Sequence, residues 1–376
     1  MKEITVFASG DSSQIKTWSN IPYFFTTSLT HKGIKVNRVS LKPNRLMRAA
    51  FDFSFTFLLR KLLKNTTYDY FRSGLHFAIV RHQIKKAIRQ FPDSDAFAFL
   101  TFSFSTAGLS QKPSIQLCDW TYDYYFKYFK NRKPDFFEKQ SIKREDKQIQ
   151  GTDCVISLFP RVAEYMKARY GSEKVHYLGN VINALFEPGK EEIFHLKRNS
   201  GKLLFVGSKK YIEGAEALIK AFELLKPAYS ELSLHLIGID ESDIKHQPAH
   251  VFCYGYLDKA LEEEKERYYD LLKEARIFIN TTPKWAAFSA SIEAMYYYTP
   301  VVVPPYEEFK TTFGATIDFG VYCEDNTPQL IAQSIKDILN HRNYEALCNQ
   351  AHESVKAYTW DAYTDKIIEK IEHLLT

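Results

Sequence analysis

HVFCYGYLDKALEEEKERYYDLLKEARIFINTTPKWAAFSASIEAMYYYTPVVVPP, residues 250–305, alternates short apolar runs with segments of helical spacing. The runs HVFCYGYL, RIFINTT and TPVVVPP have the length and residue types of buried strands. The segments between them, EEEKERYYDLLKEA and FSASIEAMYY, have the spacing of helices. Strands that alternate with helices form parallel sheets covered on both faces. One carboxylate, Glu293, lies in the second helix, and the rest of the chain has to decide its role.

The same alternation extends outward in both directions. The N-terminal half opens with a strand, KEITVFA, followed by a helix that ends near Gly33 and a second strand, IKVNRVSL. The pattern restarts at GKLLFVG, residues 201–207. Two such halves predict an α/β protein of two doubly wound, Rossmann-like domains facing a central cleft, with ligands beyond the carboxyl ends of the strands.

The domain boundaries follow from an irregular piece, residues 181–201, which has Pro, Gly and mixed charges without a clear period. We interpret it as the interdomain linker. The first domain then covers residues 1–180 and the second covers residues 202–359.

The composition excludes several classes of protein. The 376 residues carry a formal charge of +5, and the basic residues form no nucleic-acid reading motif. The five cysteines are far apart and the histidines show no metal spacing, so we expect a reducing, cytoplasmic setting and no metal. No GxGxxG follows a strand, which argues against a dinucleotide-dependent oxidoreductase. The opening residues do not have the pattern of an export signal.

A phosphate-binding turn is suggested by LLFVGSKKYIEGAEALIKAFELL, residues 203–225. A strand ends at Gly207, a helix begins near Gly214, and Lys209 and Lys210 lie between them. Such a helix start offers backbone N–H groups and a positive dipole end to a phosphate. An ordinary connecting loop with solvated lysines explains these residues equally well.

The order of YGYL, KEARIFIN, SIEAM and TPVVVP, with the FVG turn before them, resembles the nucleotide-sugar domain of the family 4 retaining glycosyltransferases. These enzymes have the GT-B fold. GDSSQIKTWSNIPYFFTTSLTHKGIKV and DCVISLFPRVAEYMKARYG resemble parts of their first domain. The resemblance covers nearly the whole chain and is more specific in the second half. It also implies that the last helix, residues 360–376, packs back on the first domain.

The resemblance implies a role for several residues of the second half. Glu293 matches the second glutamate of the family's Glu-x7-Glu motif, which holds the ribose hydroxyls, a task that suits a carboxylate. The other expected donor-binding positions are the turn residues Gly207 and Ser208, the loop residues Trp285, Ala287, Phe288 and Ser289, and the base-bordering residues Tyr254, Gly255 and Tyr256.

In the first half, the resemblance places the loop Trp18, Ser19, Asn20 and Ile21 near the diphosphate. Asp119, at the end of SIQLCD, falls near a position that often carries a polar residue facing the donor sugar. An aspartate before a tryptophan at a strand end is equally typical of a turn or helix cap.

The chain also departs from the family pattern. Trp285 stands where the family has its first glutamate, and Ser208 and Glu213 replace the usual Arg and Lys. The cations of the diphosphate site would therefore come from Lys209 or Lys210. Glu293 as a solvated helix residue, and Trp285 as a packed loop residue, are the alternative interpretations.

The resulting hypothesis is a metal-independent, retaining transferase. It would move a sugar from a UDP- or GDP-linked donor to a glycan or polyprenol-linked acceptor, in surface polysaccharide synthesis of the bacterial type. A catalytically degenerate GT-B protein that binds nucleotide or glycan, or scaffolds a partner enzyme, is the alternative.

Residues 45–64, RLMRAAFDFSFTFLLRKLLK, combine an apolar middle with basic ends. This pattern predicts either peripheral contact with the inner face of an anionic membrane or an amphipathic helix packed on the first domain. The apolar run is too short to span a bilayer.

Overall fold

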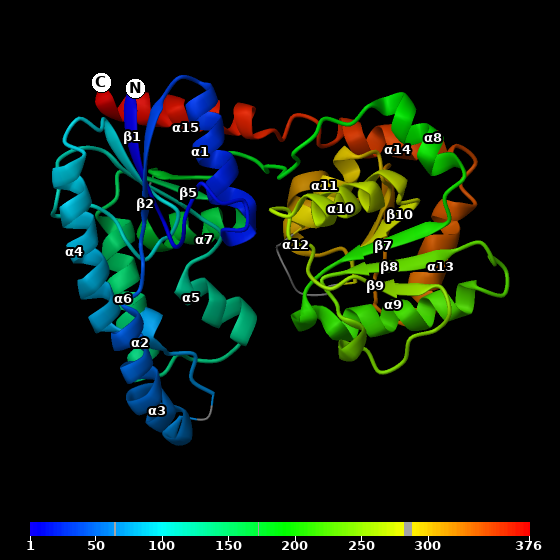
Figure 1. Ribbon diagram of the computed structural model, residues 1–376, viewed down its shortest axis with the longest axis horizontal. Helices are drawn as coiled ribbons and strands as arrows, with labels where there is room; N and C mark the ends of the chain where they lie inside the picture. The colour runs from blue at the N-terminus through cyan, green and yellow to red at the C-terminus, as the bar shows by residue number, and fades with distance from the viewer. Residues whose placement is uncertain (64, 172, 282–287) are drawn as a thin grey trace. The chain divides into compact units, whose positions relative to one another are not determined.

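The computed structural model describes residues 1–63, 65–171, 173–281 and 288–376. It divides the chain into two compact units (Figure 1). Unit 1 comprises Met1–Asn180 and Trp360–Thr376, and unit 2 comprises Val181–Thr359. Each unit is built around its own parallel six-stranded sheet. The predicted fold class, two doubly wound α/β units, is confirmed.

The sheet of unit 1 has the strand order β2-β1-β3-β4-β5-β6, and all neighbouring strands run parallel. The order reverses between β1 and β3, which is the switch point of a doubly wound sheet. The strands are β1 (Glu3–Ala8), β2 (Lys35–Ser40), β3 (Ala96–Phe99), β4 (Ser114–Cys118), β5 (Cys154–Ser157) and β6 (Val175–His176).

Helices cover the sheet of unit 1. Val80, Ile84 and Ala87 share one face of α4 and pack against the aromatic side chains of β1 and β3. The helices are α1 (Ile21–His31), α2 (Arg45–Phe51), α3 (Phe57–Leu62), α4 (Gly74–Gln90), α5 (Tyr122–Tyr124), α6 (Phe136–Gln150), α7 (Pro160–Tyr170) and α15 (Trp360–Leu375).

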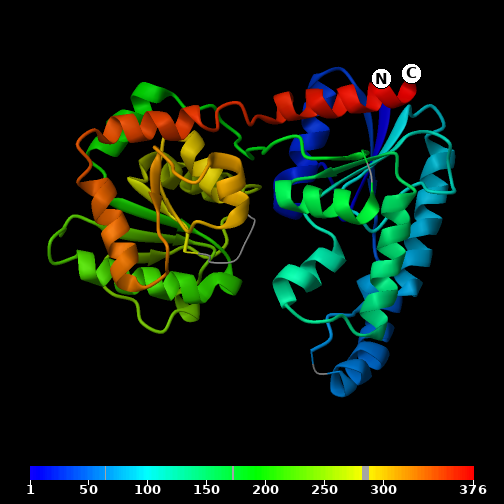
Figure 2. The ribbon, with the colours of Figure 1, turned by 180° about the vertical axis from the view of Figure 1, so that it is seen from behind.

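The C-terminal helix α15 belongs to unit 1, where it packs on α1. Ser28 donates a hydrogen bond to Asp361 at 2.7 Å, and the Trp360 ring contacts Phe24 and Phe25. The N-terminal ammonium group lies 2.9 Å from Glu372 of this helix. The two chain ends therefore lie close together (Figure 2).

The sheet of unit 2 has the order β12-β11-β10-β7-β8-β9, again with parallel neighbours. Its order reverses between β7 and β10. The strands are β7 (Lys202–Val206), β8 (Ser233–Ile237), β9 (Val251–Cys253), β10 (Ile277–Ile279), β11 (Val301–Val303) and β12 (Gly320–Tyr322).

The strands of unit 2 are mostly apolar because both faces of the sheet are buried. Leu204 and Phe278 point into one core and their neighbours Leu203 and Ile277 point into the other. The helices are α8 (Lys190–Arg198), α9 (Ile212–Leu225), α10 (Glu262–Glu274), α11 (Ser289–Tyr296), α12 (Glu307–Phe313), α13 (Pro328–Leu339) and α14 (Tyr344–Glu353).

The linker prediction for residues 181–201 is wrong for its second half, which forms α8. Ile193 and Phe194 are buried in the core of unit 2. Lys197 is also fully buried, and its ammonium group donates to the carbonyl groups of Leu272 and Ala275 and to Thr299. Lys197 occupies a core-facing position of α8, where its aliphatic stem packs like an apolar side chain. Because a charged residue stands at this position, the sequence does not show the apolar periodicity of a helix.

No helix within the described residues is long and apolar enough to cross a membrane.

Candidate functional site

The switch point of unit 2 lies between β7 and β10, where ligands of doubly wound sheets bind beyond the carboxyl ends. The loop after β7 leads into α9, and Gly214 in the first turn of α9 packs on the end of β10. A Cβ atom at Gly214 would lie 2.5 Å from the Thr281 carbonyl oxygen. Only glycine therefore allows this helix start to approach the β10 end so closely.

The turns after β7, β8 and β9 are also held together by backbone contacts. Gly207 donates its N–H to the Ile237 carbonyl group, and Gly238 donates to the Gly255 carbonyl group at 2.6 Å. Gly238 has a φ of +84°, and a Cβ atom there would lie 1.9 Å from the Gly207 oxygen. The sequence-predicted residues Gly207 and Gly255 thus border one continuous turn region.

Glu293 is buried in α11 and is held by two donors from other segments. Lys259 donates to one carboxylate oxygen and the Tyr268 hydroxyl group to the other, both at 2.8 Å. The side chains of Lys259 and Glu293 are only 9% and 7% exposed. The Lys259 ammonium group also lies over the Tyr268 ring, 4.0 Å from its centroid. Glu293 is thus not a solvated helix residue.

The remaining capacity of this carboxylate matters for binding. An ionised carboxylate has about four acceptor positions, which is more than Lys259 and Tyr268 occupy. Burial raises the pKa of Tyr268 well above its ordinary value, and the Glu293 charge raises it further. Tyr268 therefore stays protonated as a donor and Lys259 supplies the charge that compensates Glu293.

Lys259 also joins two parts of the predicted site. It follows the segment Tyr254, Gly255 and Tyr256 by three residues, and its ion pair fixes that segment to α11. Tyr256 is 70% exposed, whereas the Tyr254 hydroxyl group bonds His235 and its ring stacks on the same histidine. The structure therefore leaves Tyr256 available to a ligand and uses Tyr254 as a support.

The lysines expected at the phosphates lie in a 3₁₀ turn, Lys209–Tyr211, directly before α9. Lys209 forms an ion pair with Asp243, and the Lys210 ammonium group lies 4.8 Å from the Tyr211 ring centroid. Ser208 caps this turn without a side-chain hydrogen bond, and Glu213 lies in the first turn of α9. Glu213 places a negative charge at the positive end of this helix.

The loop after β10 is described only in part. Trp285 and Ala287 lie outside the described residues. Phe288 is buried and contacts the rings of Tyr306, Phe309 and Phe313, while Ser289 is exposed at the start of α11. Phe288 thus anchors the start of α11 in the core.

In unit 1, the loop before α1 has an unusual backbone. Trp18, Ser19 and Asn20 have φ values of 35°, 52° and 69°, although none is a glycine. The Asn20 side chain bonds the Ile15 carbonyl group, which helps to hold this conformation. Consecutive residues with positive φ store strain, and such strain is typical of functional loops.

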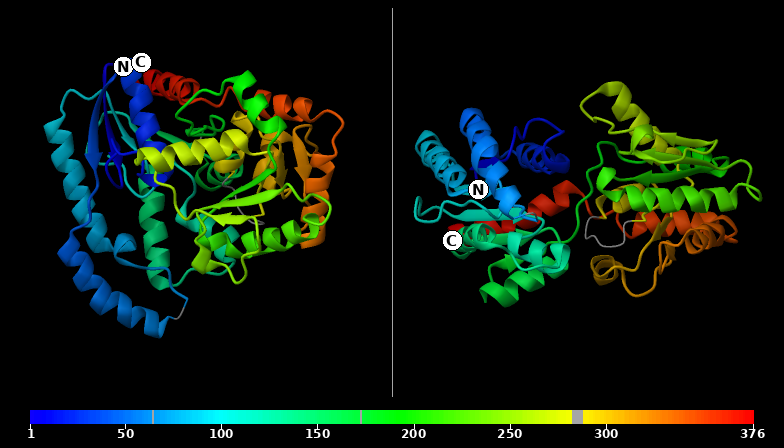
Figure 3. Two further views of the ribbon diagram at one scale, coloured as in Figure 1. Left: turned by 45° about the vertical axis from the view of Figure 1, so that its right-hand side comes forward. Right: turned by 90° about the horizontal axis from the view of Figure 1, so that it is seen from below.

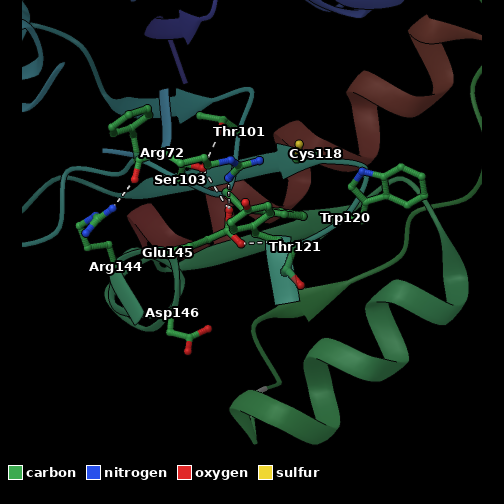
Figure 4. Close-up of polar contacts among 12 residues, drawn as sticks. Arg72, Thr101, Ser103, Cys118, Trp120, Thr121, Arg144, Glu145 and Asp146 are labelled. Carbon is green, nitrogen blue, oxygen red and sulfur yellow. Dashed lines mark hydrogen bonds and ion pairs between the residues drawn. The ribbon is translucent and has the colours of Figure 1, made fainter. Parts of the chain in front are cut away.

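Asp119 follows β4, and its carboxylate oxygen accepts hydrogen bonds from the Trp120 N–H and the Cys118 thiol group. These local bonds have the form of a strand-end turn. Near it, Glu145 of α6 is buried and accepts from the Ser103 hydroxyl group and the Tyr122 N–H, with Arg72 3.6 Å away (Figure 4). Burial raises the pKa of Glu145. This acid fixes the loops after β3 and β4.

Lys259 and Tyr268 are absent from the sequence prediction. The available sequence signal was the pair of tyrosines at 268–269 in α10, a helix rich in charged residues. Both tyrosines are buried in the structure. Nothing near Lys259 distinguishes it from the surrounding charged residues. Among the described residues, no group of three or more His, Cys, Asp or Glu side chains is placed to hold a metal ion.

Comparison with known protein families gives a match within the second unit. Residues 189–357 match the family model of the glycosyl transferases group 1. Comparison with curated protein sequences gives no match.

Solved structures resemble the whole chain. Sucrose-phosphate synthase from Thermosynechococcus elongatus has a TM-score of 0.70 at 14% identity, covering 100% of this chain and 99% of that one. Anabaena HepE in complex with UDP and glucose has a TM-score of 0.64 at 12% identity, with coverage of 99% and 100%. S. aureus MnaA with UDP has a TM-score of 0.59 at 15% identity, with coverage of 100% and 97%.

The fold is therefore GT-B, with two Rossmann-like units. Within it, the segment that matches the group 1 glycosyl transferases is the one that carries Glu293, Lys259 and the turn after β7.

Proposed function

We propose that this protein is a glycosyltransferase that takes a sugar from a UDP- or GDP-linked donor held by unit 2. The observation that carries this proposal is the buried Glu293, which Lys259 and Tyr268 orient near the carboxyl edge of the sheet. Glu293 lies within the segment that matches the group 1 glycosyl transferases. A carboxylate suits this role because it can accept hydrogen bonds from the two adjacent hydroxyl groups of a ribose.

The proposed chemistry needs stabilisation of the diphosphate that leaves with the nucleotide. The start of α9 offers backbone N–H groups, and Lys209 and Lys210 precede it. We expect transfer with retention and without a metal, to a glycan or polyprenol-linked acceptor in surface polysaccharide synthesis. Two of the structural neighbours support the donor class, since they are complexes with UDP.

The alternative is a GT-B protein that binds a nucleotide or a glycan without transferring a sugar. Ser208 and Glu213 favour it, because they replace cations at the diphosphate position and Glu213 competes with a phosphate for the α9 start. The first proposal requires both nucleotide binding and turnover, whereas the alternative requires no turnover.

Calorimetry with UDP, GDP and ADP, followed by incubation with the corresponding nucleotide sugars, tests the proposal. We expect one nucleoside diphosphate to bind in the micromolar range, and its sugar conjugates to release that diphosphate when an acceptor glycan is supplied. Binding without release would support the non-catalytic alternative. Absence of binding to every nucleotide would contradict the transferase proposal and leave only a protein that binds a glycan or scaffolds a partner enzyme.

We further propose that unit 1 contacts an anionic membrane through residues 45–62. Here α2, the π-helical turn Asp52–Thr56 and α3 form one segment that extends away from the sheet of unit 1 (Figures 1 and 3). Phe51, Phe55 and Leu59 share one side of it and face the unit, where Phe55 packs on Phe137. The predicted packing on the first domain thus involves only one side.

The other side of this segment is apolar and open to solvent. Leu46, Phe53 and Leu62 are 83%, 87% and 81% exposed, and Phe57 and Leu58 are more than half exposed. Large exposed apolar patches on a protein mark an interaction surface. Arg45, Arg48, Arg60 and Lys61 flank this patch, and this charge complements an anionic lipid surface. Cosedimentation with lipid vesicles measures the contact.

A further inference from the structure

A cavity of about 520 Å³ lies in unit 1, apart from the predicted nucleotide site of unit 2. Its volume is in the range of small-molecule sites. The loop after β1, the end of β2 and the second half of α4 line it: Asp11, Ser12, Arg38, Ser40, Lys42, Gln83 and Lys86 supply its polar groups. The end of β2 joins the end of β1 through the Leu41 N–H and the Ala8 carbonyl group.

The first notable feature of this cavity is its unpartnered polar groups. In the described part of unit 1, nine buried side-chain polar atoms have no hydrogen-bond partner, and three of them belong to residues that line this cavity. They are the hydroxyl groups of Ser12 and Ser40 and the Gln83 carbonyl oxygen. Ser12 is only 3% exposed. Each such group is destabilising unless a ligand or water satisfies it.

The orientation of the Gln83 amide is fixed by its surroundings. Its nitrogen donates to the Lys42 carbonyl oxygen at 2.8 Å. A flipped amide would place two acceptor oxygens against each other, so the nitrogen stays on Lys42 and the carbonyl oxygen stays without a donor. This oxygen can accept a hydrogen bond from water or from a ligand hydroxyl group.

The second feature is positive charge. Arg38, Lys42 and Lys86 line the cavity against a single acid, Asp11. The Asp11 carboxylate already accepts from the Ser13 N–H and hydroxyl group, at 2.9 and 2.7 Å. Arg38 donates its Nε–H to the buried Thr26 hydroxyl group. This bond uses one of the five N–H donors of the guanidinium group. The cavity therefore favours an anion.

We infer that this cavity binds a small organic phosphate that carries hydroxyl groups. The phosphate would lie between the cations and accept from the two serine hydroxyl groups, and a ligand hydroxyl group would donate to Gln83. The inference does not depend on the proposed function of unit 2.

Calorimetry of the full chain with glucose 6-phosphate, glucose and inorganic phosphate tests this inference. We expect glucose 6-phosphate to bind at least about tenfold more tightly than either of the others, because only it carries both groups. Lys86→Ala should weaken binding about five- to tenfold, whereas Lys85→Ala, the neighbouring exposed lysine that does not line the cavity, should leave it unchanged.

Ser12→Ala gives a second readout, because removing an unpartnered buried hydroxyl group should weaken binding several-fold and leave the melting temperature unchanged or higher. Glu293→Gln should not alter this affinity, which separates the site from that of unit 2. Equal binding of inorganic phosphate and glucose 6-phosphate, equal effects at Lys85 and Lys86, or no binding at millimolar concentration would overturn the inference.

Discussion

Each of the two units is built on a parallel six-stranded sheet, yet the features that point to a ligand differ between them. In unit 2 the feature is a buried carboxylate, Glu293, paired with Lys259. Unit 1 leaves large apolar side chains in solvent on α2 and α3, and unpartnered polar groups in the cavity beside β2. Unit 2 thus holds its candidate binding group in place by an ion pair and a hydrogen bond, whereas unit 1 presents exposed apolar side chains and unpartnered polar groups.

The largest effect that we predict is on the buried pair of unit 2. Lys259→Met leaves the Glu293 charge buried without its cation, and breaking such a pair costs about 3–5 kcal/mol. Thermal unfolding of the full chain should show the transition of unit 2 at a temperature lower by about 10 °C.

Lys265→Met is the matched control, because Lys265 pairs with Glu262, which is 70% exposed. An exposed pair is worth at most about 1 kcal/mol. Equal effects of the two substitutions would mean that Lys259 contributes no more than a surface lysine, and the contrast between the units would fail.

The next effect concerns the exposed apolar face of unit 1. Phe53→Ser with Leu62→Ser removes two side chains that each contribute about 1.5–3 kcal/mol when buried, so binding to anionic vesicles should weaken about 100-fold. Folding should be unaffected, because both side chains are exposed. Cosedimentation with vesicles of anionic or neutral lipid measures the change.

Leu224→Ser with Leu261→Ser, at exposed apolar positions of unit 2, is the control and should leave vesicle binding intact. If the wild-type chain binds neither type of vesicle, the membrane proposal is wrong and another partner covers this face.

A smaller effect concerns pH. Burial lowers the pKa of Lys197 from 10.5 to about 7. Between these values the unfolded chain binds more protons than the folded chain, so stability rises with pH. From pH 7 to 9 the free energy of unfolding of unit 2 should rise by about 2 kcal/mol, at a slope of up to about 1.4 kcal/mol per pH unit.

Lys197→Met should abolish this rise. The effect of Glu145 in unit 1 on stability has the opposite sign. Because burial raises the pKa of this carboxyl group, the free energy of unfolding falls as the pH rises above 4.5. The test is denaturation of wild type and Lys197→Met between pH 7 and 9. If the free energy of unfolding still rises with pH in the variant, groups other than Lys197 cause the rise.

The smallest effect is expected at the lysines before α9. Lys209 is exposed and paired with Asp243, and an exposed cation contributes little. Replacing Lys209 and Lys210 together by Ala should weaken UDP binding less than about tenfold and leave the affinity for uridine unchanged. A loss of affinity for uridine as well would show that the substitutions disturb the turn rather than the phosphate contacts.

The sequence predicts the sheets well because both are assembled from apolar runs of ordinary length, such as KEITVFA and RIFINTT. It misses β12, three residues long between Gly320 and Tyr322, since so short a run has no recognisable period. It also misses α8, whose buried face includes the charged Lys197.

For the proposed site, the sequence pattern singles out Glu293, and the structure adds what holds its carboxylate in place. Lys259 is 34 residues away in the sequence, and only the fold brings it to Glu293. Similarly, the pattern of residues 45–64 predicts an amphipathic segment, but only the packing of Phe51, Phe55 and Leu59 shows which side remains exposed. Tertiary contacts of this kind leave no local signal.

The most direct test of the central claim compares UDP, or the nucleoside diphosphate that the wild-type chain prefers, with its 2′,3′-dideoxy analogue. Wild type should bind the ribose form at least about tenfold more tightly, because hydrogen bonds to a charged carboxylate are worth about 1.5–3 kcal/mol. Glu293→Gln combined with Lys259→Met, which leaves no unpaired charge, should bind both forms equally. A double variant that keeps the wild-type preference for the ribose form would contradict the assignment of Glu293 to the ribose.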